Sequence, residues 1–153
     1  MSYLLDTHCW LWLQTTPERL PAELLDILAD RSVGLFLSAA SAWELGVKHA
    51  AGRIELPESP GDYVREGMRR GGVRELSMSH SHALEAAALP PHHRDPVDRM
   101  LVAQARLERL TLVTADRVLA AYDVDLIRVV RAADSRRAAS GVGSRRYRGS
   151  DGE

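Results

Sequence analysis

Residues 95–116, DPVDRMLVAQARLERLTLVTAD, carry the clearest structural signals of the chain. Asp95 can cap a helix, Pro96 suits the first helical position, and Asp98 is an acid in the first turn, so a helix is predicted to start here. The short apolar run 111–114 follows and predicts a strand that ends just before an acid. A helix leading directly into a buried strand is typical of α/β proteins.

The same alternation of helices and strands extends in both directions from this stretch. Further strands are predicted at residues 3–5, 35–37, 73–76 and 126–130. Further helices are predicted at residues 7–14, 21–30, 41–52, 61–70 and 80–89. Alternating elements imply a mostly parallel sheet covered by helices on both faces, with the working site beyond the carboxyl ends of its strands.

Composition indicates one folded domain followed by a basic tail. The chain has 153 residues, of which 45% are hydrophobic and 27% charged, as expected for a single globular domain. We therefore expect a domain at 1–131 and a weakly ordered Arg/Gly/Ser-rich tail at 132–153. Residues 131–153 hold six arginines against three acids, which leaves the remainder of the chain with a net charge of about −4.

Several classes of protein are disfavoured by simple features of the chain. No apolar run approaches the ~20 residues that cross a bilayer, and the N-terminus lacks a signal-peptide pattern, so a cytoplasmic protein without membrane contact is expected. The single cysteine, Cys9, excludes an intramolecular disulfide and a zinc knuckle.

Four acids are predicted to meet at one edge of the sheet. Asp6 and Asp116 follow strands, while Glu44 and Asp98 lie near the starts of helices. Carboxylates forced together require bound cations or a raised pKa, and oxygen ligands favour Mg²⁺ or Mn²⁺. Each acid also has a structural alternative, because Asp98 suits the helix dipole and Asp116 could cap a turn. Asp6 and Glu44 are harder to explain structurally, since unpaired buried carboxylates are costly.

Four segments of the chain carry a resemblance to a known family. They are LLDTHCWLW (4–12), SAASAWELGVKHAAGRI (38–54), HHRDPVDRMLVAQA (92–105) and TLVTAD (111–116). Together they closely resemble the PIN domain, and among PIN proteins the VapC toxins of bacterial toxin–antitoxin pairs. The resemblance implies a three-layer α/β/α sandwich and an endoribonuclease that depends on Mg²⁺ or Mn²⁺.

The resemblance also implies partners and site residues. It implies an RNA substrate, a cognate VapB-like antitoxin, a homodimer, and contact with operator DNA only through the antitoxin. The family's acidic quartet corresponds to Asp6, Glu44, Asp98 and Asp116, which would serve as catalytic residues and metal ligands. Thr114 matches the family's hydroxyl position, and Thr7 is expected to support the site beside Asp6.

Neighbouring residues have less decisive interpretations. Asp95 is assigned to helix capping, and a transition-metal site at the adjacent pair His92–His93 is disfavoured because neighbouring loop side chains diverge and no third soft ligand is spaced to join them. The three tryptophans, Trp10, Trp12 and Trp43, favour core or interface roles over base stacking. Three arginines flank the acids and are candidates for holding RNA phosphates, namely Arg94, Arg99 and Arg117.

Two other functional classes compete with a nuclease. A catalytically silent module on the same fold could bind RNA or protein, but such a module has no reason to keep all four acids. A phosphate-transfer receiver needs a lysine near a late strand, whereas the only lysine of this chain is Lys48, in the helix that carries Glu44. The sequence does not identify which RNA would be cut.

Overall fold

The computed structural model describes residues 1–130, which form one five-stranded sheet with helices on both faces. The strands are β1 (Ser2–Leu5), β2 (Gly34–Ser38), β3 (Val73–Leu76), β4 (Thr111–Thr114) and β5 (Leu126–Arg128). Their order is β3-β2-β1-β4-β5, and every neighbouring pair is parallel. The parallel α/β sheet predicted from the sequence is therefore confirmed.

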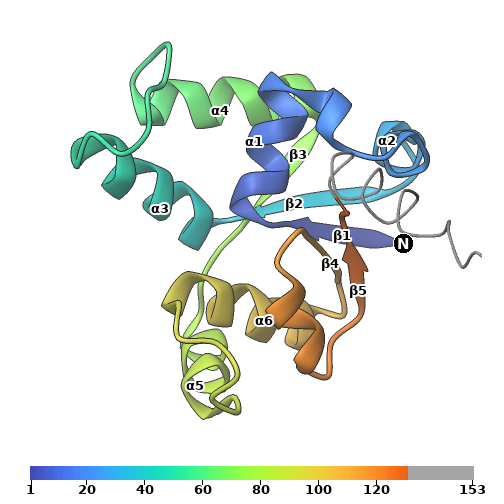
Figure 1. The fold of residues 1–153 in the computed structure, drawn as a ribbon, viewed down its shortest axis with the longest axis vertical. Coiled ribbons are helices and arrows are strands. Elements are labelled where there is room, and N and C mark those ends of the chain that lie inside the picture. Colours follow the sequence, from blue (N-terminus) through green and yellow to red (C-terminus); the bar gives the residue numbers. More distant parts are fainter. Residues whose placement is uncertain (131–153) are drawn as a thin grey trace, which may run out of the picture.

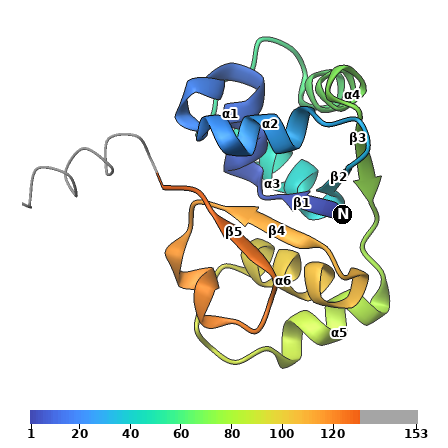
Figure 2. The same cartoon turned by 90° about the vertical axis from the view of Figure 1, so that its right-hand side faces the viewer.

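Six α-helices cover the sheet in two layers. They are α1 (Thr7–Thr15), α2 (Ala22–Ala29), α3 (Ala39–Ala50), α4 (Pro60–Gly71), α5 (His80–Ala88) and α6 (Pro96–Glu108). Figure 1 shows the order of the elements, and Figure 2 shows α1 to α4 on one side of the sheet with α5 and α6 on the other. This is the three-layer α/β/α arrangement.

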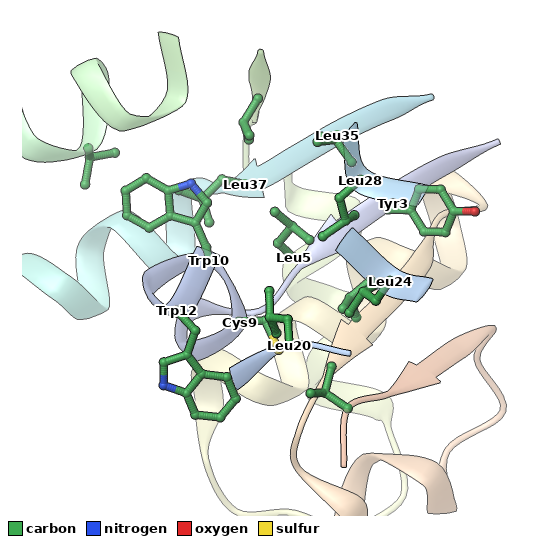
Figure 3. Packing of buried hydrophobic residues seen from close by; sticks show 14 of the residues in the cluster. Tyr3, Leu5, Cys9, Trp10, Trp12, Leu20, Leu24, Leu28, Leu35 and Leu37 are labelled. Carbon is green, nitrogen blue, oxygen red and sulfur yellow. The ribbon is translucent and has the colours of Figure 1, made fainter. Parts of the chain in front are cut away.

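The central strand β1 supplies both hydrophobic cores because its side chains alternate between the two faces of the sheet. Tyr3 and Leu5 pack with α1, α2 and α4, whereas Leu4 packs with the residues of α5 and α6. Figure 3 shows Leu5 surrounded by Leu37, Cys9 and other buried side chains. Full burial of each such leucine stabilises the fold by about 1.5–3 kcal/mol. The buried Leu4 and Leu5 also hold the carboxyl end of β1 in place.

A close contact between α1 and α4 depends on one glycine. The Trp10 indole is fully buried and meets the Tyr63 ring edge-on, with ring centroids 5.8 Å apart. A Cβ atom at Gly67 would lie 2.8 Å from Trp10 Cζ2, closer than two carbon atoms can pack. Only glycine at this position of α4 therefore allows the helix to lie against the indole, which holds α1 over the sheet.

The element boundaries differ from the sequence prediction in a few places. Helix α3 begins at Ala39 rather than near Ser41, because the Ser38 hydroxyl accepts a hydrogen bond from the Ala40 N–H and acts as the cap. Strand β5 ends at Arg128. Two short 3₁₀ helices, η1 (Pro17–Arg19) and η2 (Arg117–Ala121), were not predicted.

The predicted tail at 132–153 lies outside the described residues. Within residues 1–130, no helix combines the length and apolar character that crossing a membrane requires.

Candidate active site

The parallel pairing of β1 and β4 places two acids at the same edge of the sheet. Leu5 is paired with Val113, and the Asp6 N–H donates a 3.0 Å hydrogen bond to the Val113 carbonyl. The Asp6 side chain is 5% exposed, and its Oδ1 accepts the Cys9 N–H at 2.7 Å as the N-cap of α1. Asp6 therefore combines a capping role with a fixed position at the carboxyl end of β1.

Asp98 and Asp116 converge on His93 at this edge. The Nε2 atom of His93 lies 2.8 Å from Asp116 Oδ2 and 3.2 Å from Asp98 Oδ2. Among residues 1–130, these three side chains form the one group whose ligand atoms all lie within 4.8 Å of one another. Asp98 comes from the first turn of α6, and Asp116 caps η2 by accepting the Val118 N–H.

Burial and neighbouring acids both act on the Asp98 carboxyl. Burial, followed by repulsion from Asp95, raises the pKa of the Asp98 carboxyl from 3.8 to about 7. Asp6 and Asp116 raise this pKa further, whereas His93 opposes the rise. Asp98 is thus close enough to both other acids to feel their charge, and the site gains stability from any cation that enters it.

The geometry can be compared with proteins of known family. A model of the PIN domain matches residues 3–125. The chain belongs to the PIN domain family. The resemblance found in the sequence is therefore confirmed.

A curated relative matches part of the chain. Over 62 residues the PIN domain described here is 39% identical to Ribonuclease VapC16 of Mycobacterium tuberculosis. That similarity covers 40% of this chain and 44% of the relative, so the chain matches less than half of the relative's length.

Solved structures share the fold at low identity. VapBC2 from Rickettsia felis, bound to a promoter DNA fragment, matches with a TM-score of 0.65 and 16% identity, covering 84% of this chain and 98% of that one. FitAcB from Neisseria gonorrhoeae matches with a TM-score of 0.56 and 24% identity, covering 84% and 97%. At these identities the likeness establishes the PIN fold.

Glu44, the remaining acid of the expected quartet, comes from α3. Its carboxylate is mostly buried and lies 3.4 Å from the Lys48 ammonium one helical turn along the helix. Within the described residues, neither Glu44 nor Asp6 belongs to the compact group formed around His93. Glu44 lines a groove together with Asp95 and Trp43, next to the start of α6.

The two threonines expected to support the site both make buried contacts. The Thr114 hydroxyl oxygen accepts the Asp116 N–H at 3.1 Å, which shapes the turn that carries Asp116. The Thr7 hydroxyl donates to Ser41 Oγ at 2.9 Å and joins the start of α1 to α3. Both residues therefore hold backbone elements that carry acids of the site.

Arg99 has a structural role that the sequence did not indicate. Its guanidinium donates to the backbone carbonyls of Ala86, Leu89, Pro90 and His93. These bonds join the end of α5 and the following loop to α6, so the guanidinium is engaged within the fold. Arg94 and Arg117 are exposed beside the acids and keep their candidate role in holding RNA phosphates.

His93 is the site residue that sequence reasoning missed. The adjacent histidines do diverge, since the His92 ring packs edge-on against Tyr122 while His93 turns towards the acids. The sequence analysis considered His93 only as a ligand of a transition metal, whereas its partners in the structure are the carboxylates of Asp98 and Asp116. The one available signal was its position two residues before the Asp95 cap.

The tryptophans divide into two groups. Trp10 and Trp12 are buried in the core, as expected. Trp43 is 61% exposed beside Glu44 and so is not a core residue.

The donor set fits a hard divalent cation. Asp6, Asp98 and Asp116 offer carboxylate oxygens, which Mg²⁺ and Mn²⁺ favour over sulfur or several imidazoles. Burial first, and then the charges of Asp95, Asp6 and Asp116, raise the pKa of Asp98. A bound cation would offset the repulsion between these carboxylates.

Proposed function

We propose that this PIN domain is a metal-dependent endoribonuclease that acts as the toxin of a toxin–antitoxin pair. The observation that carries the proposal is the meeting of Asp98 and Asp116 beside His93 at the carboxyl edge of the sheet, where the charge of Asp6 also acts on Asp98. Support comes from a relative named as a ribonuclease and from a neighbour described as a toxin–antitoxin complex.

Asp6, Asp98 and Asp116 would hold Mg²⁺ or Mn²⁺, with Glu44 completing the acidic wall. A divalent cation bound there lowers the pKa of a water molecule and offsets the charge that develops on a phosphodiester during hydrolysis. Asp6 and Asp116 are fixed by their own capping bonds, so their oxygens are in place before substrate arrives. Arg94 and Arg117 would receive the RNA phosphates on either side.

The experiment that tests this function is cleavage of total cellular RNA by antitoxin-free protein. We expect discrete new 5′ ends with Mn²⁺, and their loss with EDTA or in an Asp98→Asn variant. Sequencing the ends would also identify the RNA target. Metal binding without cleavage of any RNA would favour a silent binding module on the same fold and would contradict the nuclease.

An antitoxin of the VapB type is the proposed partner. The body of the chain carries a net charge of about −4, and its acidic edge suits a basic segment of an inhibitor. The neighbour from Klebsiella pneumoniae, described as a toxin–antitoxin complex, supports a partner of this kind. Affinity for the antitoxin should fall as salt is raised, and an affinity independent of salt would contradict this view.

The resemblance also suggests an assembly and a location for the protein. We propose a cytoplasmic homodimer that reaches operator DNA only through its antitoxin. Light scattering of the antitoxin-free protein tests the dimer, with a mass of one chain as the contradicting result. Direct binding of operator DNA by the isolated chain would contradict the indirect route.

A further inference from the structure

His93 lies between two acids that would hold the cation. Its Nε2 atom is within hydrogen-bonding distance of Asp116 Oδ2, at 2.8 Å, and close to Asp98 Oδ2, at 3.2 Å. The side chain is 18% exposed, so most of the imidazole is shielded from water. The ring therefore joins the acid of α6 to the acid that follows β4.

A second hydrogen bond determines which ring nitrogen carries the proton. His93 Nδ1 accepts the Asp95 N–H at 2.9 Å, so in this arrangement Nδ1 carries no hydrogen and the proton is on Nε2. The Nε2–H therefore donates to the Asp116 carboxylate, and Asp98 Oδ2 lies 3.2 Å from the same nitrogen. A nitrogen that donates in this way has no lone pair to offer a metal, so the geometry gives His93 a role other than that of a ligand.

The backbone around His93 is held from several sides. The His93 N–H donates to the Tyr122 hydroxyl at 2.9 Å, and the His93 carbonyl accepts from Arg99 Nη1 at 3.3 Å. The Tyr122 hydroxyl in turn donates to the Pro90 carbonyl at 3.0 Å. The imidazole is therefore placed by a network of contacts rather than by a single loop conformation.

Asp116 is oriented through both of its oxygens. Oδ1 accepts the Val118 N–H at 2.9 Å, and Oδ2 accepts from His93. A carboxylate oxygen has two lone pairs, so each oxygen that accepts an N–H can still contact a cation. Outer contacts of this kind commonly fix metal-binding carboxylates and histidines in position.

We propose that His93 is a positioning residue of the metal site: its Nε2–H spaces and orients the carboxylates of Asp98 and Asp116 for a divalent cation. The inference rests on the proposed metal dependence and deepens it. It also gives one role to two hydrogen bonds, from the Asp95 N–H to His93 Nδ1 and from His93 Nε2–H to Asp116. Helix α6, which carries Asp98, and the β4 edge, which carries Asp116, are thereby set at a defined separation.

The test compares two substitutions of equal length in the antitoxin-free full chain. His93→Gln keeps a side-chain N–H donor, whereas His93→Met has none, and both lose the same ring packing. Mn²⁺ affinity is measured by isothermal titration calorimetry, without RNA. We expect His93→Met to bind Mn²⁺ about 10- to 100-fold more weakly than wild type, with His93→Gln recovering most of the loss. His92→Ala is the neighbouring control and should bind like wild type.

Two results would overturn the inference while leaving metal dependence intact. Equal affinities for the Gln and Met variants would show that the donor has no role. If His93→Met binds Mn²⁺ as tightly as wild type, the imidazole does not prepare the site. If it binds more tightly, the imidazole hinders binding. A wild-type chain that binds no Mn²⁺ would instead remove the proposed metal dependence itself, and the positioning role with it.

Discussion

Replacing Asp98 with asparagine should stabilise the metal-free protein, and increasingly so as the pH rises. The pKa of Asp98 is about 7 in the folded protein and near 3.8 in the unfolded chain. Between these values the folded state keeps a proton that the unfolded state has lost, so rising pH lowers the free energy of unfolding. Above pH 7 this penalty is constant, and below pH 3.8 it is absent.

The magnitude follows from the size of the shift. Each pH unit in this window is worth about 1.4 kcal/mol, and about two units separate pH 5 from the folded pKa. Wild type should therefore lose about 2–3 kcal/mol at this residue between pH 5 and pH 8. Asparagine does not ionise, so the variant avoids that loss.

The assay is urea unfolding with EDTA at pH 5 and pH 8, for wild type and Asp98→Asn. The advantage of the variant should widen by about 2–3 kcal/mol at the higher pH. Asp26→Asn removes an exposed acid on α2 and serves as the control, for which no such widening is expected. An advantage of Asp98→Asn that is equal at both pH values, or that shrinks, would refute the reasoning.

Three further predictions concern residues around and behind the site. Arg99→Ala should lower the free energy of unfolding by about 2–4 kcal/mol, because several backbone carbonyls lose a charged donor. Arg94→Ala, measured by the same urea unfolding, should change this free energy by less than about 0.5 kcal/mol. Equal effects of the two substitutions would contradict the structural role given to Arg99. The buried Cys9 thiol, whose pKa is raised by burial and by Asp6, should resist a thiol-specific chromophoric reagent until the chain unfolds, and rapid labelling of native protein would contradict this. Glu44→Gln should lower the free energy of unfolding by less than about 1 kcal/mol, since the contact with Lys48 is a single ion pair. The same substitution should lower RNA cleavage. Unchanged cleavage would show that Glu44 is not part of the site.

Much of the fold is predictable because its signals are local. Asp95 and Pro96 mark the start of helix α6 in the sequence. Polar residues and glycines flank the short apolar strands. Parallel strands end at one edge of a sheet, so the meeting of Asp6 and Asp116 follows from order along the chain alone. The short helices η1 and η2 are harder to foresee, because single turns depend on caps and tertiary contacts.

The site is less predictable where roles depend on three-dimensional neighbours. Arg94, Arg99 and Arg117 look alike in the sequence, but only Arg99 points into the ends of α5 and the following loop. His93 could not be recognised, because its contacts join a loop, a helix start and a strand end. The pairing of Glu44 with Lys48 was equally open, since a helical spacing of four permits the contact without requiring it.

The central claim is that the acids at the carboxyl edge of the sheet hold a divalent cation. The most direct test is a crystal of the antitoxin-free chain grown with Mn²⁺, with anomalous scattering used to locate the ion. The account predicts an anomalous peak bounded by the carboxylates of Asp6, Asp98 and Asp116. No peak there in a crystal that contains Mn²⁺ at saturating concentration, or a peak only elsewhere on the molecule, would contradict it.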